Sequence, residues 1–428
     1  MHPPTTSILN PLLRTPISLL VDDSCPVINL TYYWIRQRHA WKARFEPDMP
    51  LKPGDGDPER LHLVPQTIPA DFARQWGEWC AHEGVKGKFS MVPFPAGIAR
   101  IDQGFPNFSQ AEFNGWMRVT HEIIHPNFDI TCEMMTHSLV MDLESWQMTD
   151  SWEQFEWTNP PVDQLAGYTA ASMQVLKDAG LPCEGFTSPG AFGIHQEEAY
   201  ARAMLDASIQ VYDNPRPFYL LHVNAPPDEW PDVPIWHANK ERGEAIASIV
   251  GCTGDWFGNW TGYDEGDPDR FISADLQGGI LPMVLDRELP CVLVSHWPGM
   301  YFGGKAVGFE VLKEVKRRLD LYDPDKSKTR WMKFSEIGHY WMARKLSDIT
   351  TVSQSDQEIQ IQIDTRFPTR NFTLSIDTIA SRIQVNGVDL QPVDSRASFE
   401  EGTYLTEGSQ TFLAFELVEG QTTINLHR

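Results

Sequence analysis

The sequence lacks any apolar run approaching the roughly 18 residues that a membrane-spanning helix requires, so we expect no membrane-embedded segment. Basic residues are also few. The 35 lysines and arginines face 58 acidic residues, and the net charge of −23 argues against nucleic acids and anionic membranes as partners. An acidic sugar is still allowed as a substrate, since a site can be locally basic. No secretory signal peptide is visible, so we expect a cytoplasmic or periplasmic protein, with a signal removed from a secreted parent as the alternative.

Cysteine is scarce, and the six residues show no CxxC spacing, which argues against a zinc knuckle or a disulfide framework. We expect buried free thiols instead. Tryptophan, by contrast, is frequent, with 15 residues; indole faces stack on sugars, although most buried tryptophans are ordinary core. With 428 residues, 41% of them hydrophobic, the chain is long enough for two domains.

The first distinctive stretch is the apolar run 17–21 followed by Asp22 and Asp23. A short continuous apolar run is typical of a fully buried strand. Successive strand side chains point to opposite faces, so the two carboxylates can divide their roles, one as a base and the other as a metal ligand. The alternative is a simple turn, because Asp-Asp-Ser with a nearby proline also favours turns.

Apolar strands and amphipathic helices alternate over residues 1–350, which predicts parallel strands joined by crossover helices. Expected strands include 89–92, 183–186, 209–212, 218–223 and 290–295. Over about 340 residues a closed or nearly closed (β/α) barrel is the economical arrangement, and chemistry is then expected at the carboxyl ends of the strands. Residues 351–428 show period-two strands and an Asn386-Gly387 turn, which predict a small antiparallel β-domain.

Two histidines follow predicted strands on the same end as Asp22 and Asp23. His137 comes after 130–135 and is a candidate metal ligand, although a lone histidine is usually structural. His296 ends the strand 290–295 and is a candidate general acid, with Trp297 beside it as a sugar-stacking residue. Ser188, in a short Thr-Ser-Pro-Gly loop, is a candidate for shaping the substrate site.

The segment from His121 to His125 matches the HExxH pattern of zinc proteases. On a helical wheel, Glu122 lies opposite the apolar stripe and both histidines lie on its flank. A protease would also need a further ligand such as Glu144 or Glu153. We therefore predict that this motif lies on an outer helix, away from the strand ends.

Four short motifs occur in the order found in the NodB-type polysaccharide deacetylases, which the chain resembles over roughly residues 14–345. They are Val21-Asp22-Asp23, Glu133-Met134-Met135-Thr136-His137-Ser138, Thr187-Ser188-Pro189 and Leu293-Val294-Ser295-His296. The resemblance implies a distorted (β/α) barrel with a zinc-like ion held by one aspartate and two histidines. It also implies Asp22 as general base, Asp23 and His137 as metal ligands, and His296 as general acid.

The chain departs from this family pattern at two positions. The second histidine of the family lies four residues after the first, where this chain has Met141. Asp142, His195 and His237 are candidate replacements. The arginine that steadies the catalytic aspartate in the family is Thr187 here. A site with one histidine fewer is a weaker or differently tuned Lewis acid.

We therefore predict a carbohydrate-active enzyme on a NodB-like barrel followed by an all-β domain. The expected reaction is metal-assisted deacetylation of a polysaccharide or oligosaccharide, with a divalent cation such as Zn²⁺ as cofactor. The alternatives are an oligosaccharide dehydratase (a lyase, as in ulvan degradation) on the same fold, because Asp22 and His296 also suit that chemistry, and a non-catalytic glycan-binding relative.

Overall fold

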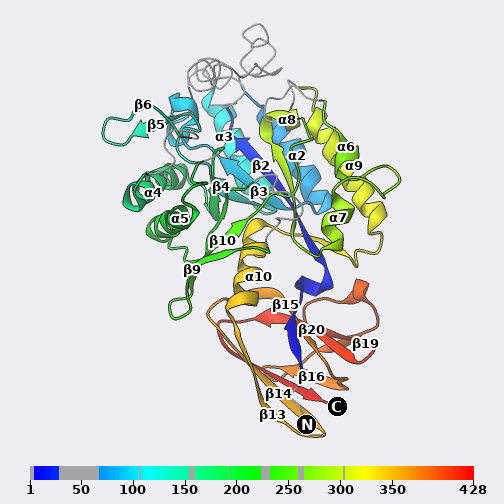
Figure 1. Ribbon diagram of the computed structural model, residues 1–428. Coiled ribbons are helices and arrows are strands. Elements are labelled where there is room, and N and C mark those ends of the chain that lie inside the picture. The colour runs from blue at the N-terminus through cyan, green and yellow to red at the C-terminus, as the bar shows by residue number, and fades with distance from the viewer. Residues whose placement is uncertain are drawn as a thin grey trace.

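The computed structural model describes residues 4–27, 67–105, 108–153, 160–190, 192–222, 232–258, 265–301 and 304–428. Figure 1 shows a mixed α/β body and a smaller β-domain beside it, so the predicted α/β class is confirmed. None of the helices in these ranges combines the length and apolar character needed to traverse a bilayer.

The α/β body is built on a nine-stranded sheet in the order β11-β2-β3-β4-β7-β8-β10-β9, with β12 also paired to β2. Neighbouring strands run parallel except β9, which is antiparallel to β10. The strands are β2 (Thr15–Ser24), β3 (Gly87–Met91), β4 (Phe128–Cys132), β7 (Gly185–Thr187), β8 (Phe218–Leu220), β9 (Ile235–Asn239), β10 (Glu244–Ile249), β11 (Cys291–His296) and β12 (Thr329–Trp331). A two-stranded hairpin, β5 (Leu139–Asp142) and β6 (Gln147–Trp152), follows β4.

We predicted a closed or nearly closed barrel. Strand pairing does not close the sheet, since within the described ranges the two end strands β11 and β9 are not paired with each other. The segment after β10 lies between β8 and β11 instead. Gly251 N–H donates to His222 O and Cys252 N–H donates to Val292 O, at 2.9 and 3.0 Å. The carboxyl ends of the strands are therefore connected by a loop where a closed barrel would have a full strand.

Helices follow most of these strands, as the alternating pattern predicted. They are α2 (Ala70–Glu83), α3 (Gln110–Val119) with a π-turn at Thr120–Ile124, α4 (Val162–Asp178), α5 (Glu197–Tyr212), α6 (Pro268–Phe271), α7 (Leu281–Asp286), α8 (Trp297–Tyr301), α9 (Val307–Tyr322) and α10 (Phe334–Leu346). The predicted strand 209–212 is wrong, because these residues are the last turn of α5. A four-residue apolar run cannot by itself distinguish a strand from a buried helical turn.

Strand β2 separates two cores. Ile17, Leu19 and Val21 pack with the helices that cover one face of the sheet. Leu20 belongs to a second core, shared with α10 and the β-domain. Asp22 lies two residues beyond Leu20 and therefore on this second face, at the carboxyl end of the strand.

The β-domain contains two five-stranded sheets. Its strands are β1 (Thr6–Ile8), β13 (Asp348–Gln354), β14 (Glu358–Thr365), β15 (Thr369–Ile376), β16 (Arg382–Val385), β17 (Val388–Asp389), β18 (Gln391–Val393), β19 (Thr403–Glu407), β20 (Gln410–Leu417) and β21 (Gly420–His427). The first strand, β1, pairs antiparallel with β15. The chain therefore contributes to this domain twice, once before β2 and again from β13 onward.

Helix α10 lies between the sheet and the β-domain and contacts both (Figure 1). The buried Asp129 on β4 accepts hydrogen bonds from the backbone N–H and the hydroxyl of Ser335, at 2.6 and 2.8 Å. Lys333 Nζ lies 3.8 Å from the same carboxylate. A carboxylate at the start of a helix accepts hydrogen bonds from the first N–H groups, which have no partner within the helix, and its negative charge interacts favourably with the helix dipole.

We expect Asp129→Ala to destabilise the protein by on the order of 2–4 kcal/mol, because it removes the acceptor of two hydrogen bonds from Ser335 and the carboxylate near Lys333. Thermal or denaturant unfolding measures the loss. Asp71→Ala, which removes an exposed carboxylate from the first turn of α2, is the control and should cost much less. Equal losses in the two variants would show that Asp129 does not anchor α10.

Candidate functional site

The candidate site is built at the carboxyl end of β2. Asp22 pairs in register with His296 on the parallel strand β11, so both reach the same edge of the sheet. The pairing of β2 with β3 is interrupted between Val21 and Ser24, and Asp23 takes a left-handed φ of 60°. Such a bulge re-aims side chains, which allows two adjacent carboxylates to enter one site. Both are buried.

Three buried side chains meet beside Asp22 and could hold a metal ion: Asp23, Glu133 and His137. The Nε2 atom of His137 lies 3.2 Å from Asp23 Oδ1 and 2.8 Å from Glu133 Oε1. The three ligand atoms all lie within 4.8 Å of one another. The structure thus brings together the two predicted ligands, Asp23 and His137, and adds Glu133, which we had not predicted as a ligand.

The environment of this triad suits a cation. Both carboxylate oxygens of Asp23 are buried, and neither has a hydrogen-bond partner among the residues that the structure describes. Burial and the neighbouring Glu133 raise the pKa of Asp23 to about 8. Burial lowers the pKa of His137, but the two carboxylates outweigh it and raise that pKa to about 9. Without a metal, both groups retain protons near neutral pH, and a cation would take the place of those protons.

The loop that carries His137 is held by Glu153. This fully buried carboxylate accepts the backbone N–H groups of Thr136 and His137, at 3.0 and 2.7 Å, and the hydroxyl of Tyr168. His137 and Met134 both take left-handed φ values, of 55° and 45°. The sequence suggested Glu153 as a protease ligand, but its carboxylate instead fixes the strained loop that presents His137.

A fully buried lysine contacts Asp22. Lys88 Nζ on β3 donates to Asp22 Oδ1 and to Thr187 Oγ1. Ser90, two residues along the same strand, lies 3.2 Å from the same Oδ1 and also donates to Glu133 Oε2. Burial raises the pKa of Asp22, although the Lys88 ammonium opposes this shift. The lysine therefore supplies the counter-charge for which the sequence had offered no candidate.

His296 forms a second acid–base pair. Its Nδ1 lies 2.8 Å from Asp255 Oδ2, in the segment that follows β10. Burial lowers the pKa of His296, but the hydrogen bond with Asp255 and the charges of Asp23 and Asp22 raise it to about 10. The imidazole is therefore cationic at neutral pH and can donate a proton. Sequence patterns did not identify Asp255.

Apart from Glu153, which accepts three hydrogen bonds of its own, the charges at this edge of the sheet balance if a divalent cation is bound. Asp22 is compensated by Lys88, and Asp255 by His296. Asp23 and Glu133 with a neutral His137 would then compensate two positive charges. Because uncompensated buried charges are costly, this count fits a divalent ion.

Two of the predicted substrate contacts are not supported by the geometry. Trp297 is fully buried and packs against Phe72, Trp76 and Phe89, so it has no face free for a sugar. Its place at the start of α8 directs it into the helix-side core. Ser188 is also buried, and its hydroxyl donates to the backbone oxygen of Phe192.

The proposed substitutes for a second histidine ligand lie elsewhere. Asp142 is exposed and accepts from the backbone N–H and hydroxyl of Ser145, both at 2.7 Å. His195 is exposed, and the ring of His237 lies 2.8 Å from the backbone oxygen of Glu198. Met141, at the family's histidine position, is buried in the core. The third group beside Asp23 and His137 is Glu133, four residues before His137 on the chain.

The HExxH segment lies away from the site. His121 falls in the π-turn after α3, and His125 follows it, close to the amino end of β4. The ring of His125 lies 2.7 Å from Glu184 Oε1 and is not in the candidate metal group. The site residues are at the opposite, carboxyl end of the strands, so the predicted separation is confirmed.

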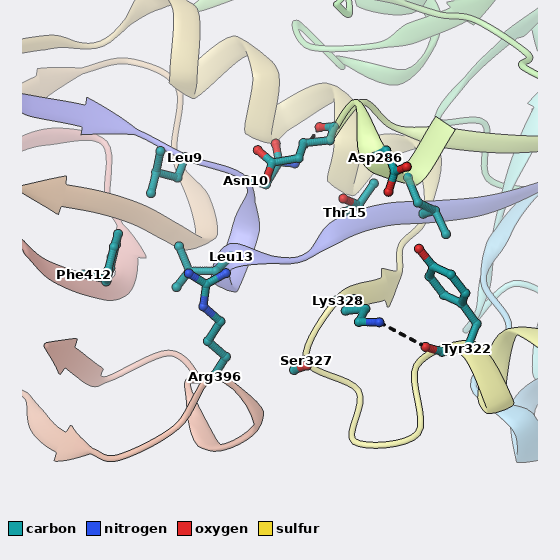
Figure 2. Close-up of a pocket in the computed structure, with 12 residues that line it drawn as sticks. Leu9, Asn10, Leu13, Thr15, Asp286, Tyr322, Ser327, Lys328, Arg396 and Phe412 are labelled. Atoms are coloured by element: carbon teal, nitrogen blue, oxygen red, sulfur yellow. Dashed lines mark hydrogen bonds between the residues drawn. The ribbon is translucent and has the colours of Figure 1, made fainter. Parts of the chain in front are cut away.

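A cavity of about 670 Å³ also lies at a distance from the site (Figure 2). Thr15, at the amino end of β2, lines it together with Asn10, Tyr322 and Arg396. Asp22 lies near the opposite end of the same strand. This cavity therefore belongs to the junction with the β-domain and is separate from the candidate site.

The triad predicts a metal-binding defect when one member is changed. We expect the wild-type chain to bind one Zn²⁺. Glu133→Gln removes a proposed ligand, so its Zn²⁺ affinity should fall by at least the roughly 10–100-fold that the loss of a hydrogen-bonding partner of a ligand costs. Isothermal titration calorimetry of the metal-free protein measures both affinities. Glu184→Gln, at the other end of the sheet, is the matched control and should bind normally. Unchanged affinity in Glu133→Gln would show that the triad is not the metal site.

No protein-family model matches this sequence, and no curated protein sequence matches it. Among solved structures, 96% of the chain aligns with Agd3, described as a novel carbohydrate deacetylase, at 11% identity and a TM-score of 0.39. The chain spans only 65% of the length of that protein. A putative α-L-fucosidase from Bacteroides thetaiotaomicron aligns over 100% of this chain and 96% of its own, at 12% identity and a TM-score of 0.33. A Flavobacterium johnsoniae dextranase aligns over 84% and 69%, at 8% identity and a TM-score of 0.31. These scores lie below 0.5, so the function must be argued from the site itself.

Proposed function

We propose that this protein is a carbohydrate-active hydrolase that removes acetyl groups from a polysaccharide or oligosaccharide with the help of a divalent cation. The observation that carries the proposal is the convergence of three elements at one edge of the sheet. These are a carboxylate base, a buried three-residue metal group and a cationic histidine. Together these groups can supply a base for the attacking water, a Lewis acid for the carbonyl and an acid for the leaving group of an acetyl ester or amide.

Asp22 is the proposed general base. It would remove a proton from the attacking water while the water's oxygen forms a bond to the acetyl carbon. Its side chain is 7% exposed, so most of it is shielded from bulk solvent. A shielded carboxylate is a stronger base than one in water, because its charge is less well solvated. Lys88 fixes the carboxylate through Oδ1.

His296 is the proposed general acid. It would give its proton to the sugar oxygen or nitrogen as the bond to the acetyl carbon breaks, so that acetate and the free sugar group are the products. Asp255 holds the ring through Nδ1 and leaves Nε2 as the proton donor. The raised pKa of His296 keeps this proton in place at neutral pH.

Asp23, Glu133 and His137 would hold the cation. Two carboxylates and one imidazole form a donor set suited to Zn²⁺ and similar divalent ions. Bound there, the ion would act as a Lewis acid that polarises the acetyl carbonyl. Glu153 and Ser90 would support the ligands through their hydrogen bonds to the His137 backbone and to Glu133.

A panel of O- and N-acetylated oligosaccharides tests the proposal, with acetate release as the measured quantity. We expect acetate release from at least one of them, lost on treatment with a chelator and restored by Zn²⁺. Release of an unsaturated, ultraviolet-absorbing uronate without acetate would instead assign the chain as a dehydratase. Metal and glycan binding with neither product would assign it as a glycan-binding protein.

A further inference from the structure

We infer that Lys88 is a positioning residue for the base: it holds Asp22 by one carboxylate oxygen and leaves the other for the substrate's water. The inference rests on the function proposed above and names a residue that acts through Asp22 without itself touching the substrate. Lys88 is fully buried, so it cannot reach the substrate directly.

The contacts on Asp22 are one-sided. Lys88 Nζ and Ser90 Oγ both approach Oδ1, and both residues belong to the same face of β3. No partner contacts Oδ2 among the residues that the structure describes. The Asp22 side chain is 7% exposed, and Oδ2 is not one of the fully buried atoms that lack a hydrogen bond, so Oδ2 retains access to solvent.

Lys88 is itself held from a second side. Its ammonium donates to Thr187 Oγ1 on β7, which lies 3.3 Å from Thr131 Oγ1 on β4. The lysine therefore connects β2 to strands on the far side of β3. A buried lysine is tolerated only when it is paired and hydrogen-bonded, and here the partner is the proposed base itself. The negative charge of Asp22 is thus compensated on its Oδ1 side, by a lysine that extends from β3.

This geometry gives Lys88 a role that packing alone would not. A neutral side chain of similar size would fill the same space but would release Oδ1 and leave the carboxylate free to turn. Misplacement of a catalytic group by about 1 Å can cost about 10²-fold in rate. We therefore expect Lys88→Met to lower kcat by about 10²-fold with little change in KM or in Zn²⁺ affinity.

The test is a double-mutant cycle with Asp22→Asn. The probe is 4-nitrophenyl acetate, and kcat, KM, Zn²⁺ stoichiometry and thermal unfolding are measured for the metal-loaded wild type, both single variants and the double variant. If Lys88 acts through Asp22, the double variant should be no slower than Asp22→Asn alone. Lys316→Met removes another buried, ion-paired lysine, on α9, and should leave kcat unchanged.

Multiplying effects on kcat, or a folded Lys88→Met variant with normal turnover, would overturn the inference. If Lys88→Met does not fold, the double variant still decides, because it leaves no unpaired buried charge. The double variant should then fold and show a cooperative thermal unfolding transition, whereas a double variant that also fails to fold would contradict the pairing. Absence of turnover in the wild type on every acetylated probe would instead contradict the proposed function, independently of the thermal result.

Discussion

Replacing Asp22 by asparagine is expected to lower kcat by roughly 10²–10⁴-fold, the range that general base catalysis contributes. Asparagine keeps the shape of the side chain and an oxygen that can accept from Lys88, but it leaves the buried lysine charge uncompensated, so thermal unfolding of the variant is measured together with its kinetics. Asparagine cannot take a proton from water. KM should change much less, because Asp22 is given no main role in substrate binding. Steady-state kinetics with an acetylated oligosaccharide measures both constants.

Asp142→Asn is the matched control for this prediction. Asp142 is exposed at the end of β5, close in sequence to His137, but outside the candidate metal group. The same chemical change there should leave kcat within experimental error of the wild type. Near-normal turnover in a well-folded, metal-loaded Asp22→Asn variant would remove this carboxylate from the mechanism.

The positions of Asp22, Asp23, His137 and His296 could be predicted because each follows an apolar strand. Parallel strands bring their carboxyl ends to one edge, so residues far apart in sequence meet without further information. In the structure, Asp22 and His296 are in register, and His137 reaches Asp23. The pattern of buried strands therefore places Asp22, Asp23 and His296, whereas His137 lies beyond the end of β4 at Cys132 and also depends on the left-handed loop.

The remaining site residues could not be predicted from strand pattern. Lys88 lies within a short strand, where a lysine normally points to solvent, and only the sheet's polar inner face explains its burial. Glu133 meets His137 because Met134 and His137 adopt left-handed φ values. Residues other than glycine rarely adopt such values, and the sequence gives no sign of them here. Both residues depend on tertiary context.

Asp255 illustrates a different obstacle, namely a loop positioned by long-range hydrogen bonds. Cys252 N–H donates to Val292 O, and Thr253 Oγ1 accepts from Val294 N–H, so the segment after β10 is held along β11. This contact carries Asp255 to His296, 41 residues away in sequence. Likewise, the pairing of β1 with β15 gives the N-terminal residues a place in the β-domain that no local pattern indicates.

The pH dependence of kcat should follow the protonation of His296, whose pKa depends on Asp255. A general acid works only while protonated, and the pKa of His296 is raised to about 10 in the metal-free protein, so kcat should fall as the pH rises through the pKa of this histidine. A cation on Asp23 would neutralise one of the charges that raise this pKa, so in the metal-loaded enzyme the fall should begin below about pH 10. Asp255→Asn removes a hydrogen bond and a charge that raise this pKa, so the fall should begin at a lower pH. His296→Gln should lower kcat by roughly 10²–10⁴-fold and abolish the basic limb.

Rate profiles of the metal-loaded variants on one acetylated oligosaccharide measure these shifts. Glu197→Gln is the matched control, because Glu197 Oε2 lies 2.9 Å from the ring of another histidine, His222. That variant removes a histidine's carboxylate partner outside the proposed site, so its basic limb should coincide with that of the wild type. A basic limb that stays in place in Asp255→Asn would mean that His296 is not the group whose proton loss ends activity. If the fall in kcat moved by the same amount in Glu197→Gln, the shift would come from the change in net charge and not from the contact between Asp255 and His296.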